Sequence, residues 1–217
     1  LKQGYNSLPD KTERIAIYKN TLAMSMHKLG TVCVNSTDNI LMSALVSLGS
    51  VGIYSNYTLI TGNVSLFVGL IYNSLTASIG NLGADCGKQK LYDTYRTLNF
   101  CCFIITSFCT LCLFSLLNPF LTVWLGEKYI FNMSVVSIIT LNYYLSGMRQ
   151  MTLKFRDALG IFWYDRYKAV AEAVINLVCS VVLTKIYGII GIFIGTTICN
   201  ICVNLWVEPH VLYKYGF

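Results

Sequence analysis

Charged side chains are scarce in this sequence. Asp, Glu, Lys and Arg make up 12% of its 217 residues, whereas an average soluble domain carries about 25%. Hydrophobic residues make up 55%, and the mean hydropathy is +0.58. So little polar surface cannot coat a soluble globule of this size, and the same composition excludes a disordered chain, a coiled coil and a disulfide-stapled secreted domain. The sequence therefore predicts a membrane protein.

Sequence motifs of catalytic, nucleotide-binding and metal-binding sites are also missing. The sequence has no phosphate-binding glycine loop, no nucleophile elbow and no His–Asp pair. Its two histidines, His27 and His210, lie far apart in the chain. Cys109 and Cys112 match a C-x-x-C spacing, but they lie within an apolar run without a second pair, which is typical of structural cysteines in membrane helices. We therefore expect a protein that is not an enzyme and that holds no metal and no cofactor.

Long apolar runs predict six membrane-spanning helices. A span needs about 20 largely apolar residues to cross about 30 Å of hydrocarbon. Runs without Asp, Glu, Lys or Arg cover 39–84, 97–126, 129–148 and 186–207, and the first divides into two spans at the small residues of 49–52. A further apolar region, 166–186, contains only a few charges. The expected helices are 24–47, 53–80, 97–118, 130–152, 167–186 and 189–211, after a cytoplasmic linker over 1–22.

The basic residues orient these spans. With six spans, 14 of the 16 Lys and Arg fall on one side of the membrane, and only Lys128 and Lys185 fall on the other. Positively charged segments face the cytoplasm, so we expect both ends of this piece to be cytoplasmic. Basic loops beside anionic membrane lipids also explain the net charge of +6 without a nucleic-acid partner.

Polar side chains inside the expected spans are the informative residues, because an unpartnered polar group is costly in lipid. Asp38 lies near the middle of the first span and is either a hydrogen-bonded contact between helices or a cation or proton site. Arg149 either snorkels to the headgroups or aims a forked donor at a phosphate. Five of the six spans carry a polar stripe, which predicts a shared water-filled interior, and the third span is expected to face lipid. The stripes include Asn35, Asp38, Asn56, Asn63, Asn142, Arg149, Glu172, Asn176, Asn200, Asn204 and Glu208.

Several ordered segments carry a family resemblance. They cover 34–40, 51–57 and 73–81 in the first half of the chain, and 156–160, 165–168, 172–176, 188–196 and 206–217 in the second half. Together they resemble bacterial polysaccharide repeat-unit flippases, which belong to the multidrug/oligosaccharidyl-lipid/polysaccharide exporter superfamily. The resemblance implies an all-α polytopic fold in the bacterial cytoplasmic membrane. This chain would be the second six-helix lobe of a two-lobe transporter, and the first lobe of the same polypeptide would be missing.

The resemblance also implies a substrate and roles for residues. The substrate would be an undecaprenyl-diphosphate-linked oligosaccharide that moves from the inner to the outer leaflet. Arg149, with Lys28 or Arg96 near the inner mouth, would attract the diphosphate, and Asp38 and Glu172 would couple transport to H⁺ or Na⁺. The residues implied to line the cavity and hold the sugar are Asn35, Asn56, Asn63, Asn142, Asn176, Asn200 and Asn204, together with Arg149.

Two alternatives stay open at this point. A lobe of a cation-coupled multidrug exporter would share this architecture, but it would need an acidic, aromatic cavity for cationic drugs. A non-transporting membrane assembly module would use the polar stripes only as contacts between helices.

Overall fold

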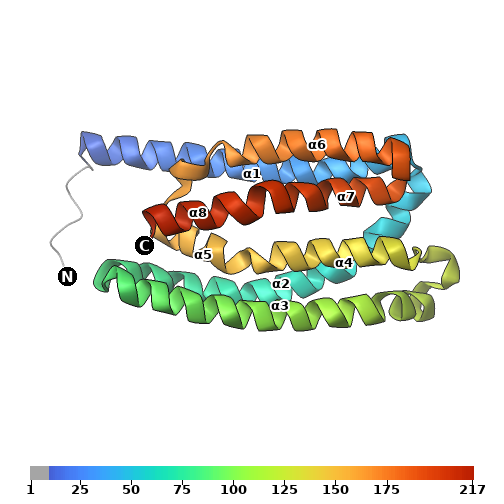
Figure 1. The fold of residues 1–217 in the computed structure, drawn as a ribbon, viewed down its shortest axis with the longest axis horizontal. Coiled ribbons are helices and arrows are strands. Elements are labelled where there is room, and N and C mark those ends of the chain that lie inside the picture. The colour runs from blue at the N-terminus through green and yellow to red at the C-terminus, as the bar shows by residue number, and fades with distance from the viewer. Residues whose placement is uncertain (1–9) are drawn as a thin grey trace.

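The fold is a bundle of helices that run along one common axis (Figure 1). The computed structural model describes residues 10–217, apart from the side chains of seven residues in the first helix, among them Asn35. The expected cavity residue Asn35 therefore lies outside the described side chains. The long helices are α1 (Lys11–Leu45), α2 (Leu48–Asp85), α3 (Lys88–Leu125), α4 (Met133–Met148), α5 (Gln150–Leu159), α6 (Lys168–Tyr187), α7 (Ile189–Cys199) and α8 (Leu205–Tyr215), and the short helical segments are η1 (Glu127–Tyr129), η2 (Phe162–Asp165) and η3 (Asn200–Asn204).

Local capping sets the helix boundaries, which differ from the expected ones. Asp10 and Glu13 form a capping box, so α1 begins at Lys11 and residues 11–22, expected as linker, are helical. Ser47 caps α2 by accepting a hydrogen bond from the Ser50 backbone N at 3.1 Å. The break between the first two helices therefore falls at 46–47, just before the small residues of 49–52.

The fourth expected helix is divided in two. α4 ends at Met148, Arg149 lies at the break, and α5 continues to Leu159. Gly160 ends α5 with a left-handed conformation at φ 67°, which a glycine adopts without strain. Helical structure thus extends beyond the expected end at residue 152.

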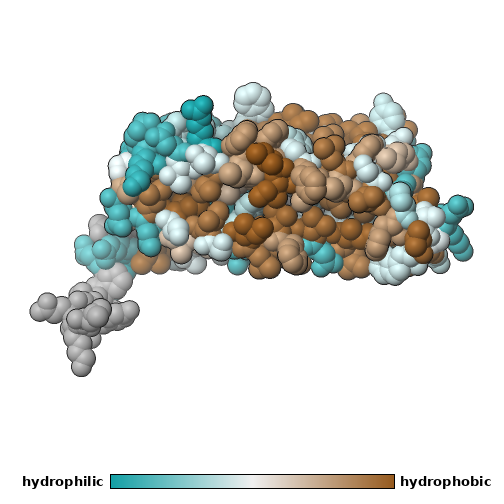
Figure 2. All heavy atoms as spheres, turned by 90° about the horizontal axis from the view of Figure 1, so that it is seen from below, coloured by the Kyte–Doolittle hydropathy of each residue, from teal (hydrophilic) through white to brown (hydrophobic). Residues whose placement is uncertain are grey.

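Four helical segments of the described chain are long and apolar enough to cross a membrane: 48–85, 88–125, 162–187 and 189–215. This establishes a multi-pass, all-helical membrane protein, although the count is smaller than the expected six. α4 has only 16 residues, and α1 contains Lys28, Asp38 and the polar run 35–39. Figure 2 shows the broad hydrophobic surface that results, with hydrophilic residues gathered at the end of the bundle where α1 begins.

α3, which was expected to face lipid, carries an exposed apolar surface. Its large apolar side chains are exposed, with Phe108 at 68% and Leu111 at 67% of their full accessible area. Phe103 and Ile104 are exposed on the same helix. Exposed residues of this kind are stable only in an apolar surrounding.

Two buried apolar clusters hold the bundle at its two ends. One is centred on Tyr57, which is fully buried and whose hydroxyl donates to Asn118 Oδ1 at 2.5 Å and accepts from the Phe131 backbone N at 2.8 Å. The other includes Phe155 and Leu212. Between these clusters, polar residues of α4 and α5 that include Asn142, Ser146 and Gln150 line a cavity.

α6 and α7 form a closely packed hairpin. A Cβ at Gly191 would lie 2.2 Å from the backbone of Leu183, and a Cβ at Gly195 would lie 2.7 Å from the Ser180 backbone N. Only glycine permits this approach, as the small-xxx-small spacing predicts. The close packing brings the polar stripes of the two helices face to face.

Candidate functional site

A polar cavity of about 480 Å³ lies in the middle of the bundle, walled by α1, α2, α4, α5 and α7. Its wall is rich in hydroxyl and amide groups and contains one carboxylate. Of the described residues that line it, none is Lys or Arg. The lining residues are Asp38, Tyr54, Thr58, Thr61, Gly62, Ser65, Ile139, Asn142, Tyr143, Ser146, Gly147, Gln150, Phe193 and Thr196.

Asp38 is the acidic group of this cavity. It is 8% exposed, and its two carboxylate oxygens lie 3.3 and 3.4 Å from Thr196 Oγ1, which donates to them. Asn176 Nδ2 donates to the same Thr196 oxygen at 3.0 Å. Among the described residues, no cationic side chain pairs with Asp38. A buried carboxylate without a cationic partner needs a bound cation or a proton to offset its cost.

Asn176 supplies a second oxygen beside this carboxylate. Its side chain is fully buried, and its Oδ1 accepts no hydrogen bond from the described residues. Asp38, Thr196 and Asn176 thus form one hydrogen-bonded row, which Asn176 joins through its amide nitrogen, while its amide oxygen remains an unsatisfied acceptor. Oxygen ligands of this kind suit a hard cation. We name Asp38, Thr196 and Asn176 the acceptor cluster.

Aromatic rings flank the carboxylate. The rings of Tyr54 and Phe193 lie 5.0 Å apart between centroids, and Tyr143 lines the same cavity. Aromatic faces attract organic cations, and a nearby carboxylate adds to this attraction. The cavity therefore has the chemistry to hold a positively charged compound.

A second polar group of residues, the charge network, lies toward the end of the bundle where α1 begins. Arg149 Nε and Nη2 donate to the two carboxylate oxygens of Glu208 at 2.9 and 2.5 Å, and Lys168 Nζ also donates to Glu208. Glu172 lies 4.0 Å from Arg149 and 3.9 Å from Lys168. Two positive and two negative charges therefore balance within a buried site.

Two asparagines complete the charge network. Asn200 Oδ1 accepts from Arg149 Nη1 at 2.8 Å. Asn204 Nδ2 donates to Glu172 Oε1 at 2.8 Å and to Asn200 Oδ1 at 2.9 Å. Both residues belong to η3, a π-helical turn between α7 and α8. Such turns occur frequently at functional sites, and here the π turn meets the α4–α5 break at Arg149.

The structure gives Arg149 partners that neither of its two interpretations named. Its side chain is 13% exposed and it does not snorkel, and its fork is bound by the Glu208 carboxylate and by Asn200 rather than held open for a phosphate. The physical reason is that Glu208 is 2% exposed and needs cationic donors. Glu208 and Lys168 were not among the predicted site residues. The four-residue spacing of Asn200, Asn204 and Glu208 is the sequence signal that could have identified Glu208 as a site residue.

The other predicted site residues separate into distinct places. Asn142 lines the cavity, but its Nδ2 donates to the Phe193 carbonyl and its Oδ1 accepts from Thr197, each at 2.9 Å, so it also joins α4 to α7. Asn56 lines a separate hollow of about 300 Å³ beside Leu125 and Tyr129. Asn63 is exposed and donates to the Leu59 carbonyl of its own helix at 2.7 Å.

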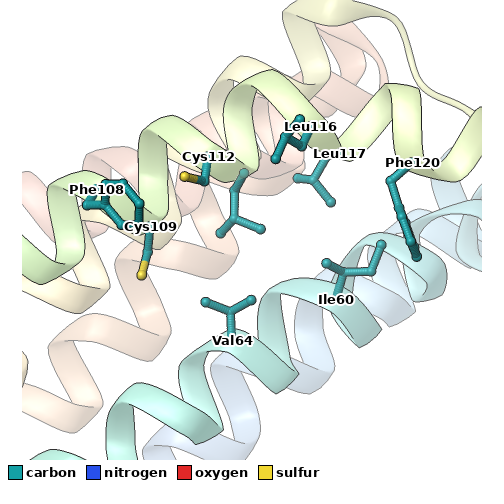
Figure 3. Close-up of a pocket in the computed structure, with 9 residues that line it drawn as sticks. Ile60, Val64, Phe108, Cys109, Cys112, Leu116, Leu117 and Phe120 are labelled. Carbon is teal, nitrogen blue, oxygen red and sulfur yellow. The ribbon is translucent and has the colours of Figure 1, made fainter.

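The two cysteines of the C-x-x-C spacing lie in an apolar setting. Figure 3 shows Cys109 and Cys112 on α3 at a groove that Ile60 and Val64 of α2 also line. The groove has a volume of about 300 Å³ and an almost entirely apolar lining. Across residues 10–217, wherever side chains are described, no group of three or more His, Cys, Asp or Glu is placed to hold a metal.

Comparison with known proteins finds a similar fold. No family model and no curated protein matches the sequence. Among solved structures, the chain is similar to a crystal structure of MATE in the bent conformation, with a TM-score of 0.76 and 15% identity. The match covers 95% of this chain and 47% of the other, so this chain spans about half the length of that protein. The chain therefore has the all-helical fold of about half of that structure.

Proposed function

We propose that this chain is one six-span lobe of a cation-coupled membrane exporter for positively charged organic compounds. The observation that carries the proposal is Asp38, a buried carboxylate without a cationic partner among the described residues, in a cavity flanked by aromatic rings. This is the acidic, aromatic cavity that the multidrug alternative requires. The likeness in fold to a MATE transporter supports the same function.

The substrate would bind in the cavity of about 480 Å³. Its positive charge would lie near Asp38, and its apolar part would lie against Tyr54, Tyr143 and Phe193. Hydrogen-bonding groups such as Thr58 and Ser146 would adapt to different substrates. Of the described residues that line the cavity, none is a cation that could hold a diphosphate, and the guanidinium group of Arg149 is already bound by Glu208.

Coupling would follow from competition for one carboxylate. The acceptor cluster offers oxygens to H⁺ or Na⁺, and the substrate cation would approach the same Asp38 from the cavity. Because each cation weakens the binding of the other by the same factor, entry of one favours release of the other. The driving ion would thus replace the exported compound in each cycle.

The proposed six spans are α1, α2, α3, α4 with α5, η2 with α6, and α7 through α8. Figure 1 supports an even number of membrane spans, because α1 begins and α8 ends at the same end of the bundle. That end is the hydrophilic end in Figure 2 and contains most of the basic residues, so it would face the cytoplasm. Alternating access would require a second lobe around the central cavity.

A second candidate function is the flipping of an undecaprenyl-diphosphate-linked oligosaccharide. The hydroxyl and amide groups of the cavity, including Thr61, Ser65 and Gln150, favour it because they could hydrogen-bond a sugar. The sequence resemblance to polysaccharide flippases favours it too. The diphosphate would then have to bind at Lys28 or Arg96, both of which are exposed.

Equilibrium binding to the purified complete protein tests the proposed substrate class. A fluorescent monovalent cationic dye should bind at least about tenfold more tightly than an uncharged analogue of the same shape, because a buried charge-assisted contact is worth about 1.5–3 kcal/mol. Fluorescence polarisation measures both affinities. Equal affinities for the two dyes would contradict an acidic substrate site, and binding of the lipid-linked oligosaccharide alone would favour the flippase.

A further inference from the structure

Some residues of the acceptor cluster and of the charge network occupy consecutive turns of α6 and of α7 with η3. Thr196 and Asn200 lie one turn apart on α7 and η3, and Asn176 and Glu172 lie one turn apart on α6. Asn204 follows Asn200 by one further turn and contacts Glu172. These five residues form a row of polar groups between the two helices, and Ser180, which donates to the Ile192 carbonyl at 3.2 Å, follows Asn176 by one turn on α6. We name this row the polar seam.

The polar seam contains two acceptors that receive no hydrogen bond from the described residues. They are Asn176 Oδ1 and Asn204 Oδ1, and both side chains are fully buried. A buried acceptor without a donor is costly, and in folded proteins a water or an ion usually satisfies it. The amide nitrogens of the same two side chains donate to Thr196 Oγ1 and to Glu172 Oε1, so one unsatisfied amide belongs to each of two different turns of the row. The row therefore provides places for water or a cation along its length.

We propose that the polar seam is a hydrated path along which the coupling cation moves between Asp38 and the basic end of the lobe. This inference rests on the proposed cation site at Asp38. The substrate would reach Asp38 from the cavity, whereas the cation would reach it from the α6–α7 side. Glu172, whose side chain is 19% exposed, would be the entrance of the path.

The charge network does not block a cation at this entrance. Arg149 and Lys168 direct their closest contacts to Glu208, and both lie about 4 Å from Glu172. The four charges cancel, so the entrance has no net positive charge to repel a cation. Glu172 thus keeps carboxylate oxygen available to an arriving ion, as its predicted coupling role requires.

Relaxation kinetics of the complete purified protein test the path. Stopped-flow fluorescence follows the response to a jump in Na⁺ concentration or in pH, and titration gives the midpoint at equilibrium. Asn204→Leu should leave the midpoint unchanged and slow the relaxation by about tenfold or more, as expected when the moving ion loses a buried polar contact. Asn63→Leu makes the same chemical change at an exposed position and should alter neither quantity. The Na⁺ and pH arms distinguish the two cations.

Failure of the path and failure of the cation site give different results. If Asp38→Asn still responds with the wild-type midpoint, the cation site itself is wrong. If Asp38→Asn abolishes the response but Asn204→Leu relaxes at the wild-type rate, the cation uses the cavity and the path is wrong. A midpoint shifted by Asn204→Leu would also overturn the path, because Asn204 would then belong to the binding site.

A second measurement tests the path even if the Asn204→Leu variant does not fold. In a background without native cysteines, Asn204→Cys and Thr184→Cys are exposed to a small, positively charged methanethiosulfonate reagent. Thr184 is equally buried on α6 but lies outside the polar seam. Modification at position 204 and none at position 184 is expected of a hydrated path. Absence of modification at both positions would overturn it.

Discussion

Asp38→Asn should abolish cation-driven export by the complete protein. The substitution keeps the shape of the side chain but replaces one acceptor oxygen by an NH₂ donor and removes the charge, which both the coupling ion and the substrate require. The loss of one buried charge-assisted contact corresponds to about tenfold or more in affinity for a cationic dye. Dye efflux from vesicles under an imposed Na⁺ or H⁺ gradient measures the transport, and polarisation measures the binding.

A matched substitution at another aspartate controls for the general effect of replacing a carboxylate by an amide. Asp93→Asn makes the same chemical change on α3, where Asp93 is exposed and hydrogen-bonds with Gln89 outside the cavity. We expect this variant to transport and bind like the wild type. Transport that persists in Asp38→Asn, or that is lost equally in Asp93→Asn, would remove Asp38 from the coupling mechanism.

Glu208→Ala should strongly destabilise the bundle. Glu208 is 2% exposed and accepts hydrogen bonds from both Arg149 and Lys168, so its removal leaves two buried cations with Glu172 as their remaining carboxylate. Breaking a buried ion pair in this way typically costs about 3–5 kcal/mol. Denaturant titration in detergent, followed by circular dichroism, measures the free energy of unfolding.

A charge-neutral double variant separates charge balance from packing. In Arg149→Met with Glu208→Met, one positive and one negative charge disappear together, and Lys168 keeps Glu172 as its partner at 3.9 Å. Replacing a buried pair by apolar side chains of similar volume is often neutral for stability. We therefore expect the double variant to recover most of the stability that Glu208→Ala loses. A double variant as unstable as the single one would show that packing, not unpaired charge, causes the loss.

Sequence periodicity predicted which faces of the helices are polar, but not which faces meet. The stripes of α6 and α7 were visible because i, i+4 spacing places side chains on one helix face. That spacing holds no information on the partner across the bundle. The pairing of Arg149 with Glu208, and the contact of Asp38 with Thr196, join helices far apart in the chain. The partner of Arg149, Glu208, was therefore not predicted, and the role of Arg149 in substrate binding stays a prediction.

The exact positions of the helix interruptions could not be predicted from the sequence. Ser146 and Gly147 precede the break at Arg149 and are a pair at which helices often kink, but they do not fix the residue at which the helix divides. Nothing in the sequence of 200–204 distinguishes a π turn from an α turn. Both irregularities lie at the charge network, where side-chain contacts from several helices compete with regular backbone geometry. Tertiary contacts of this kind override local propensity. For Asn56 and Asn63 the periodicity predicted a polar stripe, but neither residue lines the central cavity.

Deletion of the gene in its native host tests the proposed substrate class most directly. Cells are compared for retention of a cationic fluorescent dye and for lipid-linked oligosaccharide on the cytoplasmic leaflet, with the wild type or Asp38→Asn returned on a plasmid. We predict greater dye retention in the deletion strain, restored by the wild type and not by Asp38→Asn, with unchanged lipid-linked oligosaccharide. Accumulated lipid-linked oligosaccharide with unchanged dye retention would contradict the cationic substrate and establish the flippase instead.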